Sequence, residues 1–132
     1  MTITKLYSRI ADRALVAADR TLAAQVHENA AFFGYHAFES LGGALCHRNG
    51  KPYPFVHKKK IKVFVHEAKY EKYAKHVAEL AIAYGSLRNA LLYPIVRPGG
   101  CLQEPIHSIT HAQATRLVGR TKSLAIRVQM SI

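Results

Sequence analysis

Apolar residues recur at every third or fourth position along most of this chain, and its five prolines lie outside the periodic segments. This spacing matches the 3.6-residue period of an α-helix and predicts helices over about residues 4–24, 26–49 and 71–92 and from residue 110 onward. With 132 residues, 49% of them hydrophobic, the chain can bury one core. We therefore predict an all-α fold, a four- or five-helix up-and-down bundle that forms a single domain over residues 1–132.

The segments between these helices are less regular. The apolar residues of 57–65 fit a helix and also alternate as in a strand, and we favour the helix because a lone strand has no partner. Residues 94–108 contain three prolines and the pair Gly99–Gly100, which predicts a loop. Thr110, followed three residues later by Gln113, has the pattern of a capping box at the start of the last helix.

Two helices carry informative faces. The first places apolar side chains on one face that we expect to line the core: Leu6, Ile10, Ala14 and Ala17. The second has one apolar stripe, Val26, Ala30, Phe33, Ala37, Leu41 and Ala44, and a second stripe opposite, Phe32, His36, Glu39, Gly43 and Cys46. A helix that is apolar on most sides is buried on most sides. Gly42 and Gly43 each cost about 1 kcal/mol of helix stability, so we expect either a tight central crossing or an oligomer interface there.

The charge of the chain is high and unevenly placed. The formal net charge is +11, and 14 of the 19 Lys and Arg residues but only 4 of the 8 acidic residues follow residue 50. Such a balance favours polyanionic partners, with nucleic acid as the first candidate, although a basic surface also simply aids solubility. No apolar run approaches the ~20 residues that span a bilayer, no signal peptide is visible, and two cysteines make no disulfide framework. We expect a reduced, cytoplasmic protein with no membrane partner.

Arg88 is the first candidate functional residue. It lies within about 60° of the centre of the apolar stripe of the helix over 71–92, so its guanidinium is expected to be partly buried and to need an anionic partner. Glu39 is the best-placed acidic residue. Two interpretations remain: an Arg88–Glu39 pair that only joins two helices, or an Arg held by that Glu, flanked by Asn89 and aimed at a phosphate.

Two motifs carry a family resemblance. The stretch Ala30–Leu45, AAFFGYHAFESLGGAL, resembles the second helix of HEPN domains, and it is followed by Gly50 and by His57 at the head of a basic segment. Ser86–Tyr93, SLRNALLY, resembles the HEPN signature, in which an Arg and a polar residue precede a His by four to six residues. The order of these elements is similar over roughly residues 5–130.

The resemblance implies an all-α bundle that forms a homodimer, with the Arg and His of both subunits facing a shared cleft. Many such proteins are metal-independent endoribonucleases, found as toxins paired with nucleotidyltransferase antitoxins or in other defence and RNA-processing systems. Others lack the catalytic pair and bind nucleotides or RNA.

The chain departs from the signature at one position, because the residue five after Arg88 is Tyr93 and not His. Proton transfer near neutral pH suits His, whose ordinary pKa is about 6.5, better than Tyr at about 10. Tyr93 serves either as an unusual base or as an aromatic that packs the helix end. Five histidines are candidates for the missing base: His36, His57, His76, His107 and His111. His36 is the best placed, since it shares a helix face with Glu39, so the predicted catalytic set is Arg88, Asn89, Tyr93, Glu39 and His36.

The basic residues form two predicted nucleic-acid contacts. One is a lysine run after the proline-rich turn, Lys58, Lys59, Lys60 and Lys62, and the other an arginine stripe on the last helix, Arg116, Arg120 and Arg127. A solvated charge run is the alternative for the lysines. A zinc site built from Cys46, Cys101, His107 and His111 matches no compact ligand spacing, so we predict no metal and no cofactor.

These observations predict a HEPN-like dimer that binds RNA or a nucleotide phosphate in a cleft around Arg88. Whether it also cleaves RNA, as an endoribonuclease of a toxin–antitoxin or defence system, is left open by Tyr93. The alternative is a non-catalytic HEPN module that dimerises and binds a partner protein, of which a nucleotidyltransferase-type protein is one kind.

Overall fold

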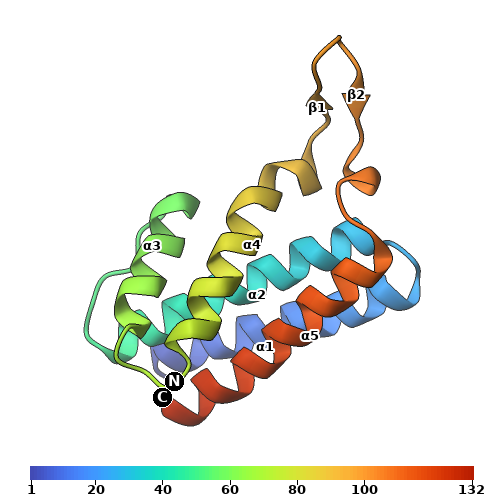
Figure 1. Ribbon diagram of the computed structural model, residues 1–132. Helices are drawn as coiled ribbons and strands as arrows, with labels where there is room; N and C mark the ends of the chain where they lie inside the picture. The colour runs from blue at the N-terminus through green and yellow to red at the C-terminus, as the bar shows by residue number, and fades with distance from the viewer.

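Helix α2 (His27–Arg48) is the centre of the computed structural model, which describes all residues 1–132, and it contacts each of the other four helices. It forms an antiparallel hairpin with α1 (Ile3–Ala23), and α5 (His111–Ser131) runs beside this pair (Figure 1). The remaining helices, α3 (His57–Ala68) and α4 (Ala74–Leu92), pack on the other side of α2. The prediction of an all-α helical bundle is confirmed, with five helices. No helix is both long and apolar enough to cross a membrane.

Local sequence signals explain several helix ends. The capping box of α5 is present, since the Thr110 side chain accepts from Gln113 N at 3.1 Å and the Gln113 side chain accepts from Thr110 N at 2.9 Å. Helix α4 ends at Leu92 because Pro94 pushes Tyr93 into an extended conformation, with φ −132° and ψ 150°. The ambiguous segment 57–65 is helical, as predicted.

The predicted loop over 94–108 contains more structure than expected. Strands β1 (Ile95–Val96) and β2 (Leu102–Gln103) pair antiparallel, and a 3₁₀ turn over Pro105–His107 follows. Gly99 and Gly100, with φ of 87° and 80°, make the tight turn, because residues other than glycine avoid this region. Figure 1 shows this hairpin standing away from the helices.

The glycines of α2 admit aromatic side chains from the same chain. A Cβ on Gly42 would lie 2.7 Å from Tyr53 Oη, and a Cβ on Gly43 would lie 2.7 Å from the ring of Tyr7. Both glycines therefore make room for aromatic side chains and not for a second backbone, and an oligomer interface is not needed to explain them. Helix α2 is buried on nearly all sides between Gly34 and Cys46, with His36 as the exposed exception.

The predicted core face of α1 is partly wrong. Leu6 and Ile10 are 47% and 41% exposed, and the buried face consists of Ala11, Ala14, Leu15 and Ala18. Small alanine side chains allow α1 to approach α2 closely, which turns the larger Leu6 and Ile10 to the flank. This flank is an apolar strip on the outer surface of the bundle.

Candidate functional site

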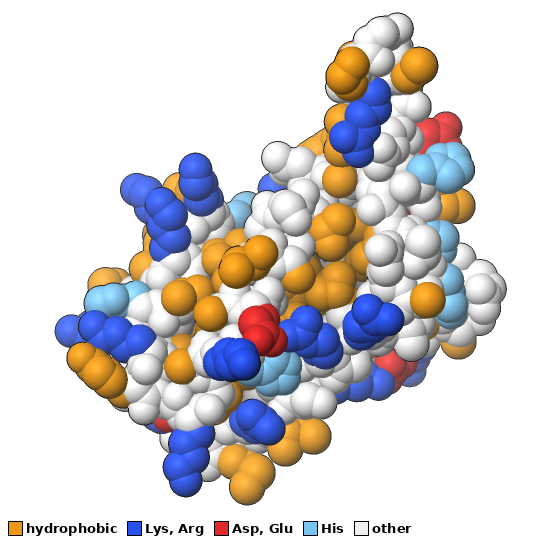
Figure 2. Space-filling view, in the orientation of Figure 1, with side chains coloured by type: hydrophobic (Ala, Val, Ile, Leu, Met, Phe, Trp, Pro, Cys, Tyr) orange, Lys and Arg blue, Asp and Glu red, His pale blue; other side chains and the backbone are white.

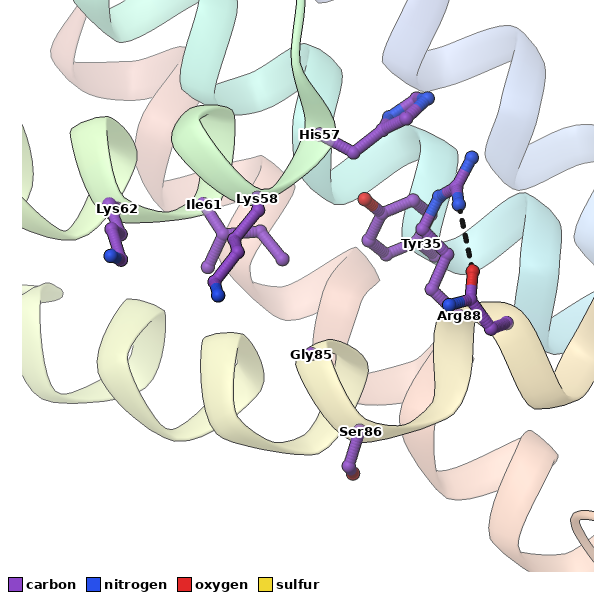
Figure 3. Close-up of a pocket in the computed structure, with 9 residues that line it drawn as sticks. Tyr35, His57, Lys58, Ile61, Lys62, Gly85, Ser86 and Arg88 are labelled. Carbon is purple, nitrogen blue, oxygen red and sulfur yellow. Dashed lines mark hydrogen bonds between the residues drawn. The ribbon is translucent and has the colours of Figure 1, made fainter.

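The sequence-predicted Arg88 lies in a pocket of about 480 Å³ where α2, α3 and α4 meet. We call this the Arg88 pocket; it is lined by Tyr35, His57, Lys58, Ile61, Lys62, Gly85, Ser86, Arg88 and Asn89. The lining contains two lysines, one arginine and no acidic side chain. Figure 3 shows Arg88 reaching from α4 toward Tyr35 and His57, with Lys58 and Lys62 entering from α3.

Arg88 is half-buried, as predicted from its place on α4. Its Nη1 donates to Asn89 Oδ1 at 3.1 Å, and its guanidinium carbon lies 6.0 Å from the centroid of the Tyr35 ring. The Nε atom is buried and has no hydrogen-bond partner. A buried donor without a partner costs free energy, so an anionic ligand that accepts a hydrogen bond from this guanidinium would bind favourably.

The predicted Arg88–Glu39 pair is wrong. None of the ion pairs includes Arg88. Glu39 is 5% exposed, and its carboxylate accepts from Tyr35 Oη at 2.5 Å and from His57 Nδ1 at 2.7 Å. The Glu39 carboxylate is therefore paired with Tyr35 and His57 and not with Arg88. Tyr35 lies between Arg88 and Glu39, with its ring against the guanidinium and its hydroxyl on the carboxylate.

Tyr35 is held as a hydrogen-bond donor. Burial raises the pKa of its hydroxyl above the usual range, the hydrogen bond and charge of Glu39 add to this, and Arg88 opposes it. The backbone of Glu39 is fixed as well, because Tyr53 Oη donates to its carbonyl oxygen at 2.5 Å. Glu39 is thus held rigidly behind the pocket.

His57 is the histidine that lines the Arg88 pocket. It is the first residue of α3, which follows the stiff Pro52-Tyr53-Pro54 connection, and its side chain is 45% exposed. A carboxylate only accepts hydrogen bonds, so Nδ1 carries the hydrogen that Glu39 receives. The other ring nitrogen, Nε2, makes no hydrogen bond within the protein and is available to a ligand.

The structure separates the rest of the predicted catalytic set. Asn89 lines the pocket beside Arg88, and Glu39 lies behind it. Tyr93 is 60% exposed beyond the end of α4, and His36 is exposed on α2; neither lines the pocket. His57 is one of the five histidines considered from the sequence as the missing base, but the sequence favours His36. Periodicity cannot show which face of α2 is covered by the start of α3, and this is what places His57 in the pocket.

Of the residues predicted to contact nucleic acid, only some line the Arg88 pocket. Lys58 and Lys62 line the Arg88 pocket, while Lys60 packs over the ring of Tyr53 at 5.7 Å. The exposed Lys59 lies on the same helix (Figure 2, basic atoms over α3). On α5, Arg120 forms an ion pair with Glu79 at 2.7 Å.

The arginine stripe of α5 does not reach the Arg88 pocket. Arg116 lines a separate hollow with Leu87 and Leu117, and Arg127 lines another with Tyr73. Figure 2 shows basic side chains along the line where α4 and α5 meet, beside an apolar strip. Arg116, Arg120 and Arg127 therefore lie on α5 outside the Arg88 pocket, and Arg120 is already paired with an acidic residue.

No group of three or more His, Cys, Asp and Glu side chains is placed to hold a metal ion. Cys46 is buried in α2, and Cys101 is exposed on the hairpin. Burial, helped by Glu67, raises the pKa of the Cys46 thiol to about 12, so this thiol stays protonated and unreactive at neutral pH.

The two thiols should therefore differ in reactivity. With a disulfide reagent that releases a coloured thiolate at pH 8, we expect one rapid equivalent, from Cys101, and a second only after unfolding in denaturant. Cys101→Ser should abolish the rapid phase. Two rapid equivalents from the folded wild-type protein would contradict the burial of Cys46.

Comparison of the chain with protein-family models, with curated proteins and with solved structures finds no match. The site must therefore be interpreted from its own chemistry. Its defining features are a half-buried Arg without an acidic partner, two lysines, and a His–Glu pair at the opposite wall.

Proposed function

We propose that this chain acts in the cytoplasm and binds RNA or a nucleotide through a phosphate group in the Arg88 pocket. The observation that carries the proposal is the guanidinium of Arg88, half-buried with its Nε unpartnered in a pocket whose lining includes two lysines and no acidic residue. A phosphate supplies the charge and the acceptor oxygens that such a group lacks.

The start of α3 adds to this preference for anions. No side chain caps the helix, so its first N–H groups and its partial positive charge lie beside His57 and Lys58 at the pocket wall. Lysines in a first turn oppose the helix dipole by about 0.3–1 kcal/mol each when exposed. A bound phosphate would relieve this repulsion.

RNA is favoured among polyanions by the resemblance of Ala30–Leu45 and Ser86–Tyr93 to HEPN domains. The proposal includes the homodimer that this resemblance implies, and a nucleotidyltransferase-type protein as partner in a toxin–antitoxin or defence system. The pocket opens between α3 and α4, where an extended single strand has access to Lys58 and Lys62.

The proposal predicts salt-sensitive RNA binding. The measurement is a fluorescence anisotropy titration with a labelled single-stranded RNA of about 20 nucleotides. If the protein contacts three phosphates, raising the salt concentration from 50 to 200 mM should lower the affinity about 20-fold. Light scattering in the same buffers gives the mass of the protein with and without RNA. A stable dimer with no affinity for RNA, or with affinity that salt leaves unchanged, would contradict the proposal.

That outcome would favour the second candidate function, a non-catalytic module that binds a partner protein. The second face of α2, which suggested this function in the sequence, is mostly buried within the chain: Glu39 and Cys46 are buried and Gly43 faces the ring of Tyr7, while His36 remains exposed. The observation that still favours it is the apolar strip of α1, where Ile3, Leu6 and Ile10 are all more than 40% exposed. In this second candidate function, the strip would be the surface on which the partner protein packs.

A further inference from the structure

We infer that His57, positioned by Glu39, is the residue that takes the proton of the 2′-hydroxyl when RNA held at Arg88 is cleaved. The inference rests on the proposed function, because it requires a phosphate of RNA in the Arg88 pocket. It assigns the proton transfer to a residue of α3 and not to Tyr93, which occupies the signature position on α4.

The geometry of His57 is that of an oriented base. Its Nδ1 lies 2.7 Å and 3.0 Å from the two carboxylate oxygens of Glu39, which fixes both the ring plane and the tautomer. Nε2 is then the basic nitrogen. Glu39 also stabilises the imidazolium that forms when Nε2 accepts a proton, as a buried carboxylate does in a catalytic triad.

The environment of the pair is rigid and nearly dry on the Glu39 side. Glu39 is 5% exposed and is held by Tyr35 through its carboxylate and by Tyr53 through its backbone. His57 is 45% exposed, so it remains accessible to a ligand. A buried orienting group behind an accessible base is the arrangement that general base catalysis requires.

No other candidate base meets both conditions. Of the eight histidines, His57 is the one that lines the Arg88 pocket. Tyr93 is the extended residue that follows α4; its side chain is 60% exposed and does not line the pocket. Tyr35 lines the pocket, but burial and Glu39 raise the pKa of its hydroxyl, so it stays protonated.

The reaction balances without a metal or a cofactor. His57 Nε2 takes the 2′-hydroxyl proton as the 2′-oxygen forms a bond to the adjacent phosphorus. The bond from phosphorus to the 5′-oxygen breaks, and that oxygen takes a proton from water; the imidazolium then returns its proton to the hydroxide. The products are a 2′,3′-cyclic phosphate and a 5′-hydroxyl end. Arg88, Lys58 and Lys62 are placed to stabilise the charge of the pentacoordinate transition state.

The test uses single-stranded RNA of about 20 randomised nucleotides in EDTA, with the 2′-deoxy strand as an uncleavable control. We expect the wild-type protein to release cyclic phosphate ends. His57→Asn should reduce kcat about 100-fold or more while the Kd stays within about threefold, because general base catalysis contributes 10² or more. The Asn amide still donates to Glu39, so this variant keeps the buried pairing and the fold.

Two further variants separate catalysis from structure. With His57→Ala, added imidazole should restore part of the cleavage rate, which it cannot do if the side chain only supports the fold. Glu39→Gln should lower kcat about tenfold or more and leave KM unchanged, as expected of a positioning residue. Tyr93→Phe should cleave within about threefold of wild type.

The outcomes distinguish this inference from the proposed function. Wild-type protein that binds RNA but leaves it uncut overturns the inference and leaves phosphate binding intact. Wild-type protein that does not bind RNA overturns both. Cleavage that survives His57→Asn, or that Tyr93→Phe abolishes, overturns the assignment to His57 alone.

Discussion

Gly42→Ala is expected to lower the free energy of unfolding by about 1–2 kcal/mol, although alanine is the better helix former. The new methyl group would lie 2.7 Å from Tyr53 Oη, 2.9 Å from Phe64 Cγ and 3.0 Å from Phe64 Cβ. Neither side chain yields easily, because Tyr53 donates to the Glu39 carbonyl at 2.5 Å and Phe64 is fully buried. Overpacking of this kind costs about 1–3 kcal/mol, which exceeds the gain of about 1 kcal/mol in helix propensity.

Gly119→Ala is the matched control for this substitution. Gly119 lies inside α5, and a Cβ there would meet no atom within 4 Å. The same exchange should therefore raise the free energy of unfolding by about 0.5–1 kcal/mol. Urea unfolding followed by circular dichroism measures both variants. Changes of the same sign would show that α2 does not approach Tyr53 and Phe64 as closely as described.

Most of the fold could be predicted because the sequence signals for a helix are local. The periodicity of the apolar residues, the Thr110–Gln113 capping box and the stop at Pro94 all act within a few residues of one another. The hairpin was missed because strands of two residues show no period. The face of α1 was misjudged because alanine serves both in a core and on a surface, and packing density favoured Ala11 and Ala18 over Leu6 and Ile10.

The site could be predicted only in part, for a related reason. The place of Arg88 on α4 indicated its partial burial, and the place of Glu39 on α2 indicated burial among apolar residues. The His57 partner of Glu39 depends on where α3 begins in space, and the contact of Arg88 with Tyr35 depends on which face of α2 meets α4; no helical period encodes either. The proline-rich turn brings His57 to Glu39, and the ring of Tyr35 lies against the Arg88 guanidinium.

Arg88→Ala is expected to lower the affinity for single-stranded RNA about 10- to 100-fold. Charge-assisted hydrogen bonds are worth about 1.5–3 kcal/mol, and the half-buried guanidinium of Arg88 offers several donors to one phosphate. The fold should survive the change, because Arg88 forms no ion pair and its one hydrogen bond is to the neighbouring Asn89. The RNA affinity of Arg88→Lys should fall between those of the wild-type protein and Arg88→Ala, since an ammonium group keeps the charge but lacks the planar fork of donors.

Arg13→Ala is the matched control, because it removes the same charge from an exposed position on α1 that lines a different hollow. Its effect on affinity should stay within about threefold, since a distant exposed charge is screened by salt.

The most direct test of the Arg88 pocket as a phosphate site is therefore a parallel anisotropy titration of one labelled single-stranded RNA with the wild-type protein, Arg88→Ala and Arg13→Ala at 100 mM salt. We predict a loss of tenfold or more for Arg88→Ala and of no more than about threefold for Arg13→Ala. Equal losses for the two variants would show that RNA responds only to net charge, which would contradict the assignment of the site.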